Sequence, residues 1–206
     1  MRSDTIDGFL SGLAARIPAP GGGATAGLHA AQGAALVAMV ARYSNGPKYA
    51  EHAATIDRVR ESADDLCERS LELAEQDVAA FGAVGQAYGL PRSTPVEKTA
   101  RSQAIASALA EAGRVPARVL AVAERIIALA EELRPVGNPN VISDIAAAAD
   151  AARAAASTAR VNVEINLCAS TELENRAELV EAIASTDEIL LQADKTTAAV
   201  REQILR

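Results

Sequence analysis

One stretch constrains this chain more than any other, residues 18–27 with the sequence PAPGGGATAG. Its two prolines end any helix that precedes them, because proline lacks a backbone N–H and disfavours helical geometry in the residue before it. The glycines that follow, Gly21, Gly22 and Gly23, leave the backbone free and its amides unshielded by side chains. The stretch therefore predicts a sharp turn that leads directly into the start of a helix.

That helix is expected over residues 24–42, which are mostly small or aliphatic and contain no proline. The first amides of such a helix have no intrahelical partner, and the helix dipole adds partial positive charge to them. This end suits an anionic or carbonyl-bearing ligand. It is not a P-loop, because no Gly-Lys-Ser or Gly-Lys-Thr follows the glycines. A tight turn where two backbones pack closely explains the glycines equally well.

Hydrophobic spacing predicts helices along the whole chain, and no segment shows the sustained alternation of a sheet strand. The sequence Thr94-Pro95-Val96-Glu97 reads as a capping box with proline at the first helical position. Pro116 lies inside an otherwise helical pattern, so a kink or a break is expected there. Six helical segments are predicted in all: residues 4–16, 24–42, 48–88, 94–133, 138–167 and 172–205.

Residues 48–88 carry an apolar stripe at alternating spacings of three and four, which is typical of a helix that lies along others in a bundle. Only 2% of the residues are aromatic, so one thin bundle makes a poor core by itself. We therefore expect an all-α, elongated bundle of about five to six long helices. We expect residues 1–206 to form a single domain that pairs into a symmetric dimer.

Composition excludes several kinds of partner. The net charge of −7 argues against nucleic acid, since phosphate binding requires clustered lysine and arginine. Neither a signal peptide nor an uncharged apolar run that could span a bilayer is evident, so no membrane partner is expected. Cys67 and Cys168 lie far apart in helical context, which fits core thiols in a reducing cytoplasm.

Asp77 is the first residue that does not suit a plain core. It occupies a position on the apolar stripe, where an ionised carboxylate needs partners or a wet cleft, or else its pKa rises. A stripe that simply turns outward at this point is the alternative. The two histidines, His29 and His52, have no second ligand at metal-like spacing, so no metal site is predicted.

The second unusual group is polar and lies in the segment 138–167. Asn140 and Asp144 are four residues apart and share a helix face, and Asn162 lies five full turns beyond Asp144 on the same stripe. The separation is roughly 27 Å, too long for one small ligand on a single helix. The two ends therefore serve different purposes, or a second subunit brings them together. For Asn162 and Asn166, hydrogen bonding between helices is the alternative to a ligand contact.

Several stretches together resemble one family, the formimidoyltetrahydrofolate cyclodeaminases and methenyltetrahydrofolate cyclohydrolases. The resemblance begins with the PAPGGG stretch and covers nearly the whole chain in order. It departs from the family at His29, where a small residue is expected. The other matching motifs are Ala34-Ala35-Leu36-Val37-Ala38-Met39-Val40, Asp77 with Ala80-Phe81, Ala87-Tyr88 with Leu90-Pro91, Ala104-Ile105, Val115-Pro116, Asn138-Pro139-Asn140 with Ser143-Asp144, and Asn162-Val163-Glu164-Ile165-Asn166.

This resemblance implies an all-helical, homodimeric and cytoplasmic enzyme of folate one-carbon metabolism that needs neither a metal nor a redox cofactor. The first expectation is a hydrolase that opens 5,10-methenyltetrahydrofolate to 10-formyltetrahydrofolate. A chain of this length has no room for a formiminotransferase domain, and without that donor of the formimino group hydrolysis is the more useful reaction. The alternative is a formimidoyltetrahydrofolate cyclodeaminase, which is an ammonia lyase. A non-catalytic folate-binding or scaffold module is the alternative of another class.

On the same resemblance, the residues divide into three roles. Asp77 is expected to be the general acid–base, because a carboxylate on an apolar stripe tends toward a raised pKa. Asp144 is expected to orient or anchor the pterin, and the segment's dipole helps to keep it ionised. The remaining residues are expected to bind substrate: Gly21, Gly22 and Gly23 through their amides, Lys98 and Arg101 through the anionic glutamate tail, and Asn140, Asn162 and Asn166 through hydrogen bonds.

Overall fold

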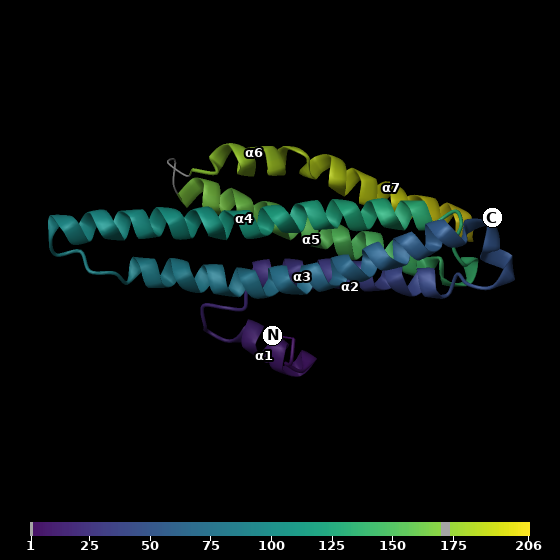
Figure 1. Ribbon diagram of the computed structural model, residues 1–206, viewed down its shortest axis with the longest axis horizontal. Helices are drawn as coiled ribbons and strands as arrows, with labels where there is room; N and C mark the ends of the chain where they lie inside the picture. The colour runs from purple at the N-terminus through teal and green to yellow at the C-terminus, as the bar shows by residue number, and fades with distance from the viewer. Residues whose placement is uncertain (1, 170–173) are drawn as a thin grey trace.

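The computed structural model describes residues 2–169 and 174–206, and within these residues every regular element is a helix (Figure 1). The long helices lie side by side in an elongated bundle, as the sequence predicted. The elements in order are α1 (Ile6–Ala14), α2 (Gly22–Arg42), the 3-10 helix η1 (Pro47–His52), α3 (Ala53–Tyr88), α4 (Pro95–Leu133), the 3-10 helix η2 (Pro139–Val141), α5 (Ser143–Ala169), α6 (Arg176–Ala184) and α7 (Thr186–Ile204).

Helix α2 is the centre of the packing and contacts α3, α4 and α5. Its inward face is built from small residues, among them Ala26, Ala30 and Ala34, which are fully buried. At Gly33 a Cβ atom would lie 3.0 Å from the carbonyl oxygen of Ala148, so α2 and α5 approach closely. Small side chains make this approach possible, and α4 supplies the bulk of the core with isoleucine and leucine.

By length and composition alone, α2 could also cross a membrane, since Gly22–Arg42 has a mean hydropathy of 1.3. In the bundle, however, 61% of its most apolar window is buried against other helices. That pattern is typical of the core helix of a globular bundle.

The capping box at the start of α4 is confirmed. The Thr94 hydroxyl accepts a hydrogen bond from the Glu97 N–H at 3.2 Å, and the Glu97 carboxylate accepts one from the Thr94 N–H at 2.8 Å. Together the two bonds satisfy donors that a helix start otherwise leaves without partners.

Of the kink or break predicted at Pro116, the break does not occur, because α4 continues from Pro95 to Leu133. Pro116 has no N–H to donate to the carbonyl of Ala112, one turn earlier. That carbonyl instead accepts a hydrogen bond from the side-chain amide of Asn166 on α5, at 3.4 Å. A neighbouring helix thus supplies the donor that proline lacks, and the helix remains continuous.

The C-terminal segment also differs from prediction, since α6 and α7 replace one helix over residues 172–205. The division falls at Ser185, whose hydroxyl donates to the carbonyl of Ala182 and so competes with the helical pattern. Asp187 and Glu188 then lie in the first turn of α7, where the helix dipole favours acidic side chains. The sequence offers Ser170 or Thr171 as the cap of the segment 172–205, and both lie outside the described residues.

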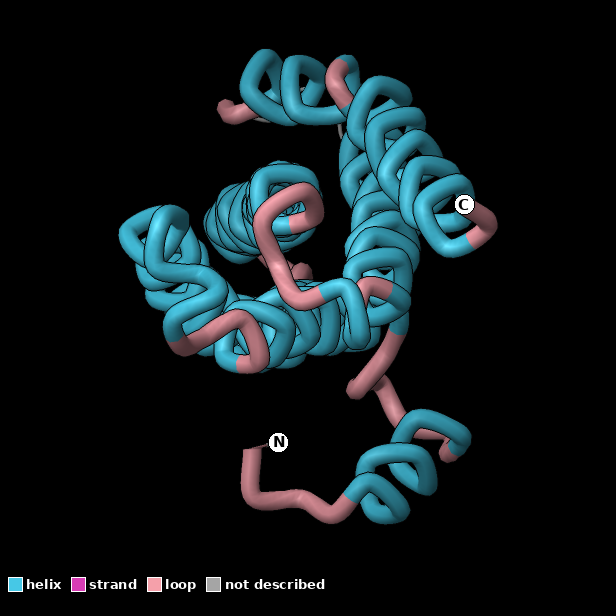
Figure 2. Tube along the Cα trace, turned by 90° about the vertical axis from the view of Figure 1, so that its right-hand side faces the viewer, coloured by secondary structure: helices cyan, strands magenta, loops and turns pink. Residues whose placement is uncertain are grey.

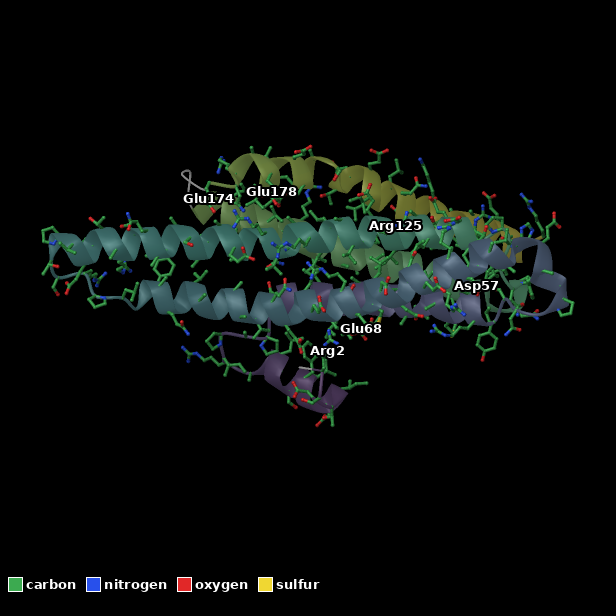
Figure 3. All side chains as sticks on the ribbon, viewed as in Figure 1. Arg2, Asp57, Glu68, Arg125, Glu174 and Glu178 are labelled. Carbon is green, nitrogen blue, oxygen red and sulfur yellow. The ribbon has the colours of Figure 1, made fainter. Side chains whose placement is uncertain are left out.

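Helix α1 stands apart from the bundle, as Figures 1 and 2 show from two directions. None of its residues is buried, and the Thr5 hydroxyl caps it by accepting from the N–H of Gly8. The segment before it is tied to α3 by an ion pair between Arg2 and Glu68 at 2.6 Å (Figure 3). The apolar side of α1 is therefore left without a core of its own.

Candidate active site

A cleft of about 280 Å³ opens at the N-terminus of α2, where α3, α4 and α5 converge. Most of the residues that sequence reasoning singled out lie on its walls. The lining residues are Pro18, Ala19, Gly21, Gly22, Gly23, Asp77, Ala80, Phe81, Ala112, Asn162, Ile165 and Asn166.

Asp77 is the only ionisable side chain in this lining. Its carboxylate faces the first turn of α2 and accepts a hydrogen bond from the backbone N–H of Ala24. Burial raises the pKa of Asp77 above its ordinary value, and the bond from Ala24 offsets only part of that rise. Asp77 therefore combines the environment of a proton-exchanging carboxyl group with access to a cleft.

The position of the Asp77 carboxylate requires a glycine at residue 23. A Cβ atom at Gly23 would lie 2.0 Å from Oδ1 of Asp77 and 2.4 Å from its Cγ, well inside van der Waals contact. Any larger residue would therefore displace Asp77 from the helix start. The close-packing interpretation of the glycine stretch is correct at this position, and the atom packed against the backbone is the candidate catalytic group itself.

Gly21 and Gly22 have more room. A Cβ atom at Gly22 would be 3.7 Å from Nδ2 of Asn162, an ordinary contact, and one at Gly21 would meet nothing within 4 Å. Gly21 is the N-cap of α2 and makes no side-chain cap bond. Because the first amides of a helix lack intrahelical partners, this edge of the cleft offers N–H donors beside the Asp77 carboxylate.

Asn162 and Asn166 line the cleft from α5, and their side-chain amides are fixed by backbone carbonyls. Asn162 donates to the carbonyl of Thr158 at 2.8 Å, and Asn166 donates to that of Asn162 at 2.7 Å. Asn166 also satisfies the Ala112 carbonyl that Pro116 leaves free. With their N–H groups so engaged, both side chains retain a carbonyl oxygen that can accept a hydrogen bond from a ligand.

Two apolar side chains that sequence reasoning did not propose as site residues also flank the cleft. Phe81 is 53% exposed and Ile165 is 66% exposed, although both are large hydrophobic residues. Phe81 belongs to the apolar stripe of residues 48–88, and its exposure agrees with the alternative that this stripe turns outward near Asp77. Apolar walls with one carboxylate and fixed amide oxygens suit a planar ring that carries several N–H groups.

Asp144 and Asn140 do not lie at this cleft. Asp144 is in the first turn of α5, and Asn162 follows it by about 27 Å along the same helix. Asn140 lies in η2, is exposed, and donates its backbone N–H to Oδ1 of Asn138. Within a single chain, Asp144 therefore does not reach the cleft that contains Asp77, and its assignment to the reacting carbon remains a prediction that would need a second subunit.

Lys98 and Arg101 also lie away from the cleft lining, near the tip of the hairpin formed by α3 and α4. The Arg101 guanidinium donates to the carbonyl of Tyr88 at 3.1 Å and lies 5.6 Å from the centre of the Tyr88 ring. Lys98 is exposed one turn earlier. Their assignment to the substrate tail remains a prediction, and any such contact would be made outside the cleft.

A larger cavity of about 360 Å³ lies at the other end of α2, but its charged residues are already paired. Arg42 forms an ion pair with Asp64 at 2.7 Å, and Arg60 pairs with Asp57 at 3.4 Å. Among the described residues, no group of three or more His, Cys, Asp and Glu side chains could hold a metal ion. The cleft at Asp77 is therefore the better candidate for a reaction.

The fold and the cleft thus define a class, namely an all-helical bundle with a half-buried carboxylate at a glycine-rich helix start. A model of the formiminotransferase-cyclodeaminase family matches residues 5–185, and the chain belongs to this family. The resemblance inferred from the sequence motifs is confirmed.

The named relatives include both a cyclohydrolase and cyclodeaminases. A methenyltetrahydrofolate cyclohydrolase of Methylorubrum extorquens is 38% identical over 98% of this chain and 96% of its own length. A formimidoyltransferase-cyclodeaminase of Mus musculus is 32% identical over 95% of this chain, which spans only 36% of that longer protein. The crystal structure of a formiminotetrahydrofolate cyclodeaminase from Thermotoga maritima superposes with a TM-score of 0.86 at 28% identity, over 100% of this chain and 99% of that one.

Proposed function

We propose that this chain hydrolyses 5,10-methenyltetrahydrofolate to 10-formyltetrahydrofolate. The observation that carries the proposal is the half-buried Asp77, which has a raised pKa and lies at an open helix start in a cleft with apolar walls. The identity of 38% to a methenyltetrahydrofolate cyclohydrolase, over nearly the full length of both chains, favours this reaction within the family.

In this proposal Asp77 carries the protons. As general base it takes a proton from a water molecule while the water oxygen bonds to the methenyl carbon between N5 and N10. As general acid it then returns the proton to N5 as the bond from that carbon to N5 breaks. The hydroxyl oxygen on that carbon loses its proton to solvent and becomes the carbonyl oxygen of the formyl group, which stays on N10. A carboxyl group with a raised pKa suits both steps, because it is a stronger base than an ordinary carboxylate and, once protonated, can still return the proton. The steps need no metal and no redox cofactor.

The other cleft residues bind in this proposal. The carbonyl oxygens of Asn162 and Asn166 accept hydrogen bonds from N–H groups of the pterin, which lies between Phe81 and Ile165. The first amides of α2, at Gly22 and Gly23, donate to polar atoms near the reacting carbon. The glutamate tail extends toward the basic tip at Lys98 and Arg101, where positive charge offsets the acidity of the chain.

The second candidate is formimidoyltetrahydrofolate cyclodeaminase, and the close structural match to the Thermotoga maritima cyclodeaminase favours it. Here N10 bonds to the formimino carbon and loses its proton to Asp77. The carbon–nitrogen bond to the amino group then breaks as that nitrogen is protonated, and ammonia leaves. Both reactions pass through a tetrahedral carbon between two nitrogens, so the same cleft serves either one.

The test is the nearly isosteric change Asp77→Asn, assayed with both the methenyl and the formimino substrate. The kcat for the true substrate should fall by about 10²- to 10⁴-fold, because a general acid–base is lost, while substrate binding persists. The substrate that supports turnover by the unaltered chain identifies the reaction. Turnover of neither substrate by the unaltered chain would favour a non-catalytic folate-binding module. Full kcat in Asp77→Asn would contradict the role of Asp77.

We further propose a homodimer located in the cytoplasm, with neither nucleic acid nor a membrane as partner. Cys67 and Cys168 are free thiols, which is consistent with a reducing compartment. The net charge of −7 disfavours binding to phosphate backbones.

A further inference from the structure

Helix α5 leaves an uncharged stripe outside the bundle. Its members recur at spacings of alternately four and three residues, the repeat by which a helix packs along another helix. All are exposed or half-buried, with Val161 at 60% and Ile165 at 66% exposure. The stripe, called here the α5 seam, consists of Ala147, Ala151, Ala154, Thr158, Val161 and Ile165.

Apart from Asp144, the charged residues of α5 lie on another side of the helix, and three of them contact α7. Arg153 pairs with Asp194 at 2.7 Å, and Arg160 pairs with Asp187 at 2.6 Å. Asp150 accepts a hydrogen bond from the Thr197 hydroxyl at 2.9 Å. Because these charges lie on another side of α5, the α5 seam is left uncharged over about five turns.

Helix α2 lies beside α5 and exposes a similar stripe. Thr25, His29, Gln32, Leu36 and Met39 recur at spacings of four and three, each half-buried or exposed, and no Asp, Glu, Lys or Arg occurs from Gly22 to Ala41. The two stripes together form one continuous uncharged face.

Helix α1 borders the same face and is also uncovered. With α2 it lines a groove of about 320 Å³, where Ile6 is 82% and Leu10 is 54% exposed. A helix of 9 residues is not stable in water without packing against something else. A single partner could therefore cover both the uncharged face and α1.

We propose that a second copy of this chain covers this face with its α5 seam antiparallel to the first, and that Asp144 of each copy completes the cleft of the other. The inference rests on the proposed function. A second copy is the occupant we infer because one seam, repeated by a two-fold axis, meets an identical uncharged seam with the same spacing.

The register follows from the position of the cleft on α5. Suppose that the two-fold axis passes between the two α5 helices at the level of Ala154. Because the helices are antiparallel, the residue ten positions before Ala154 in one copy then lies level with the residue ten positions after Ala154 in the other copy. Asp144 of the partner subunit then lies level with Glu164, within about one turn of Asn162 and Ile165 in the cleft lining. Asp144 and Asn162 are also on the same side of α5, and a two-fold axis perpendicular to the helices preserves that side.

This arrangement gives a role to the site residues that one chain keeps apart. Asp144, half-buried at the start of α5, would face the substrate from across the interface, and Asn140 would follow it one turn away. The dimer then requires Asp144 and Asn162 to lie about 27 Å apart along one helix, since each chain supplies the two ends of its α5 to two different clefts.

The decisive experiment is complementation between two inactive chains. Asp77→Asn and Asp144→Asn chains, carrying different affinity tags, are expressed together and purified over both tags. Each single-variant homodimer should lose at least tenfold in kcat/KM. The mixed dimer should recover about one half of wild-type activity, because one of its two clefts then contains both changes and the other contains neither.

The matched control is a mixed dimer of Asp77→Asn and Asn162→Ala, two residues that line one cleft within a single chain. Both of its clefts are damaged, so no recovery is expected. If both single-variant homodimers are inactive and the mixed dimer of Asp77→Asn and Asp144→Asn does not recover activity, the shared site is overturned. The proposed function is then still intact. Full activity in both single variants would instead remove the proposed function.

The interface has its own test. Val161→Glu places a charge on the seam at a side chain that is 60% exposed, so the chain should fold but dissociate to monomer in light scattering. Val180→Glu is the control, since Val180 is 47% exposed on α6, away from the seam, and this variant should remain a dimer. A wild-type monomer overturns the proposal, as does a monomer that binds vesicles of phosphatidylcholine and phosphatidylglycerol through the same face.

Discussion

Replacing Gly23 with alanine adds one methyl group at the point where α2 meets Asp77. The added Cβ would lie 2.0 Å from Oδ1, 2.4 Å from Cγ and 2.6 Å from Oδ2 of Asp77, so the carboxylate must leave its position. Its hydrogen bond from the Ala24 N–H is then lost, and the start of α2 loses its acidic partner. The same substitution thus disturbs the fold and the candidate catalytic group.

The size of the effect follows from opposing terms. A hydrogen bond to a charged group contributes about 1.5–3 kcal/mol, and forcing extra volume into a packed site costs about 1–3 kcal/mol. Alanine favours a helix over glycine by up to about 1 kcal/mol, and Asp77 regains solvation when it is displaced. We expect a net loss of about 1–3 kcal/mol in the free energy of unfolding, measured by urea denaturation.

Two comparisons isolate the cause. Gly22→Ala places its methyl group 3.7 Å from Nδ2 of Asn162, so it should leave the free energy of unfolding within about 0.5 kcal/mol of wild type. In an Asp77→Ala background, Gly23→Ala should have little effect, because the carboxylate it displaces is absent. The coupling in this double-mutant cycle should therefore be about 1–3 kcal/mol.

Activity provides the second measurement. Turnover of methenyltetrahydrofolate, followed by its absorbance, should fall in Gly23→Ala toward the level of Asp77→Asn. Equal stability and equal turnover in Gly23→Ala and Gly22→Ala would refute the reasoning, since it would show that the contact with Asp77 constrains neither the fold nor the reaction.

Two further predictions concern charge. Removing both cations in Lys98→Gln/Arg101→Gln should raise KM by about two- to fivefold per charge, with a larger increase for longer polyglutamate tails; an equal increase for all tail lengths would exclude a tail contact. Because burial raises the pKa of Asp77, the folded chain holds this proton at higher pH than the unfolded chain does, so the stability gained on protonation is lost as pH rises through the folded pKa. In urea denaturation between pH 4 and 8, wild type should therefore lose stability relative to Asp77→Asn as pH rises, and a constant difference would contradict a raised pKa.

The helices were largely predictable because their ends are encoded locally. The cap Thr94 with Glu97 and the breakers around residues 18–21 and 89–91 act within a few residues of the backbone that they control. Asp77 was predictable as an anomaly for the same reason, since its place on an apolar stripe is visible without knowledge of its neighbours. For these features the local chemistry was sufficient, because each depends on residues in the same stretch of chain.

Two contacts that the sequence did not reveal come from partners that are distant in sequence. Pro116 does not break α4 because the donor for the Ala112 carbonyl comes from Asn166, 54 residues farther along the chain than that carbonyl. Arg101 appeared free to bind a substrate tail, yet it donates to the carbonyl of Tyr88 across the hairpin. No pattern within one helix reveals which side chain of another helix will face it.

The two interpretations of the glycine stretch, a close-packing turn and a ligand-facing helix start, describe one arrangement. Gly23 lets Asp77 approach the first turn of α2, and the bond from Ala24 holds the carboxylate there. An acid fully bonded by helix amides would have a depressed pKa and would be a weak base, whereas burial at this cleft shifts the balance the other way. The glycines therefore do more than expose amides to a ligand. They allow the Asp77 carboxylate to lie close enough to the start of α2 to be held by a hydrogen bond, while its pKa stays raised.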